Sequence, residues 1–184
     1  MSSRFPPTSI CRTTTRTKNN CMRILGIDPG FAQTGWGVVD VFGQRYRPVS
    51  FGVVKTTTET GQAERIHEIA SRLGEIAAKF EVGQVGMEDI FFAKNVSSAI
   101  TVAKVIGAVT HQLLSQGLSV RLFSPPQIKT TVTGYGNADK NQVQEMMRLM
   151  LGLEAIPRPD HAADALAAAI CLATYSATES RVLR

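Results

Sequence analysis

The sequence lacks any uninterrupted apolar run of the ~18–20 residues that a membrane-spanning helix needs. Its most apolar stretch, residues 162–173, is interrupted by Asp164. Apolar residues make up 43% of the 184-residue chain, which is enough to bury a core. We therefore expect one folded domain with no membrane contact.

Cysteine is scarce, with three residues at positions 11, 21 and 171. An odd, scattered number without Cys-x-x-Cys spacing gives neither a disulfide framework nor a cysteine metal site. This pattern favours a reducing compartment, so we expect a cytoplasmic protein.

Acidic residues are absent from residues 1–21, which contain four basic side chains, and the rest of the chain is nearly neutral. The net charge of +5 is therefore mostly that of this segment and does not by itself indicate a nucleic-acid partner. We predict that residues 1–21 form a disordered or dispensable extension, with organellar targeting as the minor alternative. Residues 22–175 are assigned to the folded domain and 176–184 to a C-terminal tail.

Hydrophobic periodicity predicts five strands and five helices. The strands are expected at residues 22–28, 35–42, 46–56, 84–88 and 118–123, and the helices at 63–80, 97–116, 127–132, 139–151 and 161–174. An antiparallel meander followed by alternating helices and strands is typical of an α/β domain. We expect a mixed five-stranded sheet with helices on both faces, and sites in such sheets lie near strand ends.

Two acidic residues stand at predicted strand ends. Asp28 opens an Asp-Pro-Gly sequence, which also makes a good turn without any catalytic role. Glu88 is the last residue of a short predicted strand that is expected to lie in the interior of the sheet, and Asp89 follows it. The last predicted helix adds Asp164 within an otherwise apolar segment, where an unpartnered carboxylate is costly.

His161 precedes Asp164 by one helical turn and projects from the same face. Asp160, directly before it, is a plausible helix N-cap. Converging carboxylates would repel one another, and divalent cations with a preference for oxygen ligands, Mg²⁺ or Mn²⁺, would resolve that repulsion. A pair of such ions is the usual arrangement for phosphodiester cleavage, with His161 as a ligand or a proton relay.

Several motifs resemble the RuvC family of Holliday-junction resolvases. They occur in family order over nearly the whole domain: MRILGIDPG (22–30), TGWG (34–37), MEDIFFAKN (87–95), QIK (127–129), GYG (134–136), ADK (138–140) and HAADALA (161–167).

The resemblance implies an RNase H-like fold and a bacterial, homodimeric endonuclease that nicks four-way DNA junctions symmetrically in recombination and repair. It implies two Mg²⁺ ions per active site, with Mn²⁺ as a possible substitute, held by Asp28, Glu88, His161 and Asp164. Some family members have Asp at the position of His161, so metal preference is open. Cleavage would leave 5′-phosphate and 3′-hydroxyl ends.

The resemblance also implies three DNA-binding residues. Phe91 matches a family aromatic that lies against junction bases, and Lys129 and Lys140 match positions that face the scissile phosphate. They lie in residues 90–150, which carry six basic and two acidic side chains. The family further implies that helix 97–116 contributes to the dimer interface and that the nuclease works with the RuvA–RuvB branch-migration complex.

Three alternatives stay open at this stage. An actin-like ATP-binding domain shares the Asp-Pro-Gly pattern but needs two lobes. A YqgF-like nuclease acting on RNA would leave the region around Phe91 and the loop 134–140 unexplained. A non-catalytic junction binder would be expected to have lost one of the acids.

Overall fold

The computed structural model describes residues 21–90 and 96–182, so Phe91 lies outside the described residues. Five strands form one sheet in the order β3-β2-β1-β4-β5. The first three strands pair antiparallel, and β4 pairs parallel with both β1 and β5. Their bounds are β1 Cys21–Asp28, β2 Gln33–Phe42, β3 Arg45–Lys55, β4 Gln84–Glu88 and β5 Ser119–Phe123.

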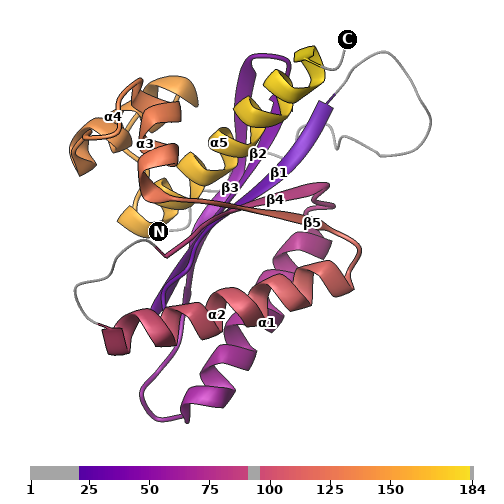
Figure 1. Cartoon of the computed structure of the whole chain (residues 1–184), viewed down its shortest axis with the longest axis vertical. Helices are drawn as coiled ribbons and strands as arrows, with labels where there is room; N and C mark the ends of the chain where they lie inside the picture. The colour runs from indigo at the N-terminus through magenta and orange to yellow at the C-terminus, as the bar shows by residue number, and fades with distance from the viewer. Residues whose placement is uncertain (1–20, 91–95, 183–184) are drawn as a thin grey trace.

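Helices cover both faces of the sheet, which confirms the predicted architecture (Figure 1). Helices α1 (Gln62–Lys79) and α2 (Val96–Ser115) pack on one face. Helices α3 (Pro125–Thr133), α4 (Lys140–Met150) and α5 (Asp160–Val182) pack on the other. Each face of the sheet therefore has its own hydrophobic core. Because side chains alternate along a strand, Ile24 packs in the core beneath α3, α4 and α5, while Leu25 packs in the core beneath α1 and α2.

Helix α5 packs directly against the backbone of the sheet because glycine occupies the strand positions beneath it. A Cβ added at Gly26 would lie 1.8 Å from the backbone oxygen of Ala165, and one at Gly86 would lie 2.7 Å from that of Ala168. Residues 162–173 of the helix are all buried except Asp164, and most are alanine. The small residues on both sides therefore fix the depth at which α5 sits.

Two helix boundaries differ from the sequence prediction by more than one residue. Helix α3 begins at Pro125 rather than Gln127, because Ser124 and Gln127 form a capping box and proline is accepted in the first turn. Helix α5 continues to Val182 rather than ending at Thr174, so most of the segment predicted as a tail is helical.

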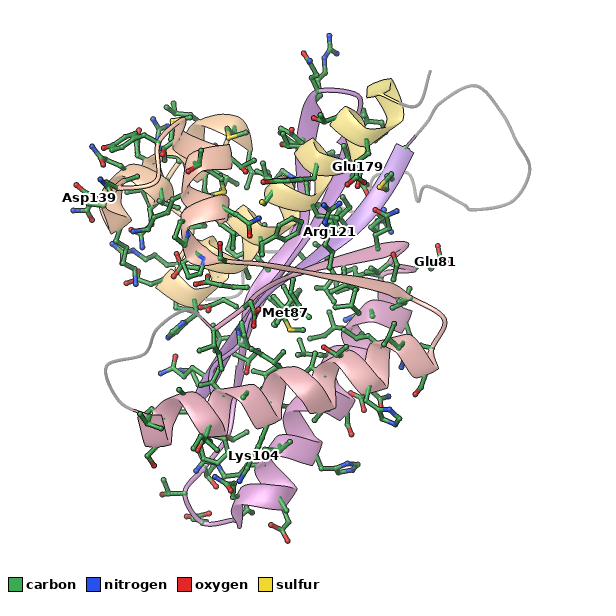
Figure 2. All side chains as sticks on the ribbon, in the orientation of Figure 1. Glu81, Met87, Lys104, Arg121, Asp139 and Glu179 are labelled. Atoms are coloured by element: carbon green, nitrogen blue, oxygen red, sulfur yellow. The ribbon has the colours of Figure 1, made fainter. Side chains whose placement is uncertain are left out.

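The part of α5 that continues beyond Thr174 is held against β5. Glu179 accepts a hydrogen bond from Arg121 at 2.6 Å, and Figure 2 shows these two side chains together beside α5. The Arg121 guanidinium also lies over the ring of Tyr175. In the same view Met87 points from β4 into the core shared with α1 and α2. Among the described residues, no helix combines the length and apolar character needed to cross a membrane.

Candidate active site

The acidic residues at the ends of β1 and β4 lie at the same edge of the sheet. In the parallel pairing of these strands Ile27 is aligned with Met87, so the next residues, Asp28 and Glu88, follow at neighbouring strand ends. Both line a cavity of about 340 Å³. The topology thus unites two carboxylates that are 60 positions apart in the sequence.

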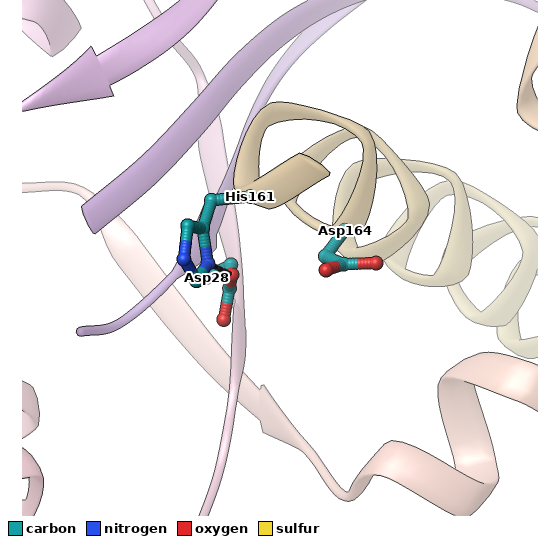
Figure 3. A group of neighbouring side chains, drawn as sticks. All are labelled: Asp28, His161 and Asp164. Carbon is teal, nitrogen blue, oxygen red and sulfur yellow. Dashed lines mark hydrogen bonds and ion pairs between the residues drawn. The ribbon is translucent and has the colours of Figure 1, made fainter. Parts of the chain in front are cut away.

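The N-terminal part of α5 brings two further side chains to this edge. On β2, Gly35 pairs with Asp28, and a Cβ at Gly35 would lie 1.9 Å from the backbone oxygen of His161. The glycine therefore permits α5 to begin directly against the end of β1. His161 Nδ1 lies 2.6 Å from Asp28 Oδ2, and Asp164 follows one turn along the helix (Figure 3).

These residues form a compact cluster. Ligand atoms of Asp28, His161 and Asp164 all lie within 4.8 Å of one another. Glu88 lines the same cavity but is not part of this tightest group. The full lining consists of Asp28, Glu88, Pro125, Ile128, Lys129, Lys140, Val143, His161, Asp164 and Ala167.

The cavity disfavours negative charge. Burial raises the pKa of Glu88 to about 8, with further contributions from the charges of Asp28 and Asp164. Burial likewise raises the pKa of Asp164 to about 6, and Asp28 adds to that effect. The pKa of His161 is raised chiefly by its hydrogen bond to Asp28, which favours a protonated ring that donates through Nδ1.

The chemistry of this donor set fits a divalent cation. Carboxylate oxygens suit Mg²⁺ or Mn²⁺, and a bound cation would stabilise the ionised forms that burial disfavours. Asp28, His161 and Asp164 stand close enough together to share one ion.

Two lysines complete the cavity. Lys129 lies on α3 and reaches the cavity wall, where its charge opposes the rise in the pKa of Glu88. Lys140, the first residue of α4, lies 3.1 Å from Asp160 and 3.9 Å from Asp164. Six of the seven predicted site residues thus meet in one cavity, and the seventh, Phe91, is outside the described residues.

Asp160 has a role that its sequence position did not reveal. The sequence indicated a helix cap, whereas the structure pairs its carboxylate with Lys140 and Arg158. Lys140 belongs to another helix, so no local spacing pattern predicts this contact.

The mixed sheet, with carboxylates gathered at the ends of β1 and β4 and the start of α5, defines a protein of the RNase H-like class. A family model described as "Crossover junction endodeoxyribonuclease RuvC" matches residues 24–172. The chain therefore belongs to the RuvC family.

Individual relatives agree with this assignment. A crossover junction endodeoxyribonuclease RuvC from Heliobacterium modesticaldum is 45% identical over 152 residues, covering 83% of this chain and 94% of the relative. The structure of Thermus thermophilus RuvC superposes with a TM-score of 0.80 at 37% identity, covering 86% of this chain and 97% of that one. Thermus thermophilus RuvC in complex with Holliday junction substrate superposes with a TM-score of 0.77 at 34% identity, covering 85% and 96%.

Proposed function

We propose that this protein is a crossover junction endodeoxyribonuclease that resolves four-way (Holliday) DNA junctions by paired, symmetric nicks. The observation that carries the proposal is the meeting of Asp28, Glu88, His161 and Asp164 in one cavity with two lysines. The related Thermus thermophilus protein was solved with Holliday junction substrate, which supports the choice of DNA structure. The cellular role would be recombination and DNA repair.

Magnesium is the proposed cofactor, with two ions per active site and Mn²⁺ as a possible substitute. Asp28, Glu88, His161 and Asp164 would hold the ions. Divalent cations held there would supply an activated water and would stabilise the departing 3′ oxygen in phosphodiester hydrolysis.

The chain's own side chains orient the reaction. Asp28 holds the His161 ring through Nδ1 at 2.6 Å, which fixes the direction of the imidazole. Lys129 and Lys140 present positive charge at the cavity wall, where a DNA phosphate would otherwise meet mainly carboxylates. Stacking of Phe91 on a junction base stays a prediction from the family resemblance.

We further propose a homodimer, because two symmetric nicks need two cavities. Helix α2 exposes apolar residues along one face, including Ile100 at 52% and Leu114 at 55% of their full surface. Burial of this face against a second copy would remove apolar area from water. Sedimentation analysis of wild type and Ile100→Glu tests the interface, and a monomeric wild type would refute it.

The remaining family features are proposals of the same kind. They comprise action with the RuvA–RuvB complex, a bacterial cytoplasmic location, a dispensable segment at residues 1–21 and a nuclease domain from residue 22. The end of that domain, predicted at residue 175, is extended by helix α5 to Val182.

The decisive experiment compares purified wild type, Asp28→Asn and Asp89→Asn on four-way and linear duplex DNA, with and without Mg²⁺. Asp89 is an exposed acid beside Glu88 that does not line the cavity, so its substitution is the matched control. We expect wild type and Asp89→Asn to nick only the junction and only with Mg²⁺. Asp28→Asn should bind the junction but not nick it, because the change removes a ligand and reduces repulsion of phosphate.

Three outcomes would count against the proposal. Nicking by Asp28→Asn at the wild-type rate would contradict the site assignment. Junction binding by wild type without Mg²⁺-dependent nicking would indicate a non-catalytic binder. Preferential cleavage of RNA would favour the YqgF-like alternative.

A further inference from the structure

Asp160 is not one of the residues that line the cavity, yet its carboxylate pairs with Lys140, which does line it, and with Arg158. Its Oδ2 is 3.1 Å from Lys140 Nζ on α4, and its Oδ1 accepts a hydrogen bond from Arg158. The pKa of the Asp160 carboxyl is lowered first by its contact with Lys140 and also by the buried amide of Gln144, one turn further along α4. Asp160 therefore joins the start of α4 to the start of α5.

Lys140 stands between two carboxylates. Its ammonium nitrogen lies 3.1 Å from Asp160 but 3.9 Å from Asp164, a member of the three-residue cluster. If Asp160 lost its charge, Asp164 would be the carboxylate left to pair with Lys140. A lysine ammonium paired with Asp164 would compete with a metal ion for the same oxygen.

We propose that Asp160 is a positioning residue that holds Lys140 at the cavity wall and prevents its ammonium group from approaching Asp164 more closely than the observed 3.9 Å. This inference rests on the proposed metal-dependent function of the cavity. The position of Lys140 has to meet two conditions. Its ammonium group must leave Asp164 available to a metal ion, and it must still lie close enough to the metal ions to contact a DNA phosphate.

The test measures metal binding and cleavage in Asp160→Asn, Lys140→Met and the double variant. Asn keeps the shape of the Asp160 side chain and removes its charge. Mn²⁺ binding to the protein alone is followed by electron paramagnetic resonance of free Mn²⁺. The Mg²⁺ concentration for half-maximal junction nicking is the second measurement, and thermal melting verifies that each variant folds.

The expected result depends on the background. Asp160→Asn should weaken Mn²⁺ binding by about tenfold, in the range of changes to residues that support metal ligands. In the Lys140→Met background the same substitution should have no effect, since the competing ammonium group is gone. Glu145→Gln is the matched control, because Glu145 lies on α4 and pairs with Arg148 rather than Lys140, and it should bind Mn²⁺ as wild type does.

Two results would overturn the inference. Wild-type Mn²⁺ affinity in Asp160→Asn would show that Lys140 does not move onto Asp164. Equal weakening with and without Lys140 would show that Asp160 acts on the ion through its own charge. Failure of wild type to nick junctions with Mg²⁺ would instead refute the proposed function, so the two failures are distinguishable.

Discussion

Glu88 offers the sharpest quantitative test of the cavity, through the dependence of stability on pH in the absence of metal. Its pKa is raised from 4.5 to about 8, first by burial and then by Asp28 and Asp164. Below pH 4.5 the carboxyl is protonated in both folded and unfolded states. Between pH 4.5 and about 8 the folded state keeps a proton that the unfolded chain has lost, so stability falls as pH rises.

The magnitude follows from the size of the pKa rise. Since each pKa unit is worth about 1.4 kcal/mol, Glu88 should lower the free energy of unfolding by about 3–4 kcal/mol between pH 5 and pH 8. Asp164 and His161 act in the same direction, because the folded state also raises their pKa values. Glu88→Gln removes only the first contribution, so the difference between the two proteins isolates it.

Urea unfolding in EDTA at several pH values is the appropriate assay. Glu88→Gln should become more stable than wild type as pH rises, whereas Glu59→Gln, at an exposed glutamate between β3 and α1, should follow wild type. Adding millimolar Mg²⁺ should flatten the wild-type profile and raise its melting temperature, because metal binding favours the ionised carboxylates. Parallel profiles for wild type and Glu88→Gln in EDTA would refute the reasoning.

Three other predictions concern the packing of α5, a buried ion pair and the N-terminal segment. Gly26→Ala should destabilise the protein by about 1–3 kcal/mol or more in urea unfolding, since the new methyl would lie 1.8 Å from the oxygen of Ala165; a neutral effect would mean that α5 can shift freely. Asp40→Ala should cost about 3–5 kcal/mol in the same assay, because Asp40 and Arg23 form a buried bidentate pair and the arginine would lose its carboxylate; a cost below about 1 kcal/mol would place the pair with ordinary surface salt bridges. A chain that starts at Met22 should nick junctions at the wild-type rate, and a large loss of activity would show that residues 1–21 contribute.

Much of the fold could be predicted because its signals are local. The apolar alternation and the turn residues give the strands β1 to β4 within two residues of their observed bounds. Helix α5 was predicted too short because its last turns have mixed polarity. They are held by tertiary contacts of Arg121 with Glu179 and Tyr175, which leave no periodic signal.

The candidate site could likewise be predicted only in part from the sequence. Carboxylates at two strand ends and within an apolar helix are visible in the sequence, since an acid among buried residues needs a partner. Their distances are not visible. His161 and Asp28 are 133 positions apart, and they meet because Gly35 leaves room for the backbone of α5.

The sequence by itself thus determined the element types, the mixed sheet and the residues with the chemistry to hold a metal, because hydrophobic period and residue type act over short stretches of chain. Only the tertiary structure decided how deeply α5 sits on the sheet, and that Lys140 pairs with Asp160 in preference to Asp164. The physical reason is that close packing and charge pairing depend on atoms brought together by the whole fold. From the sequence alone, a glycine that lies beneath a helix cannot be distinguished from a glycine that forms a turn.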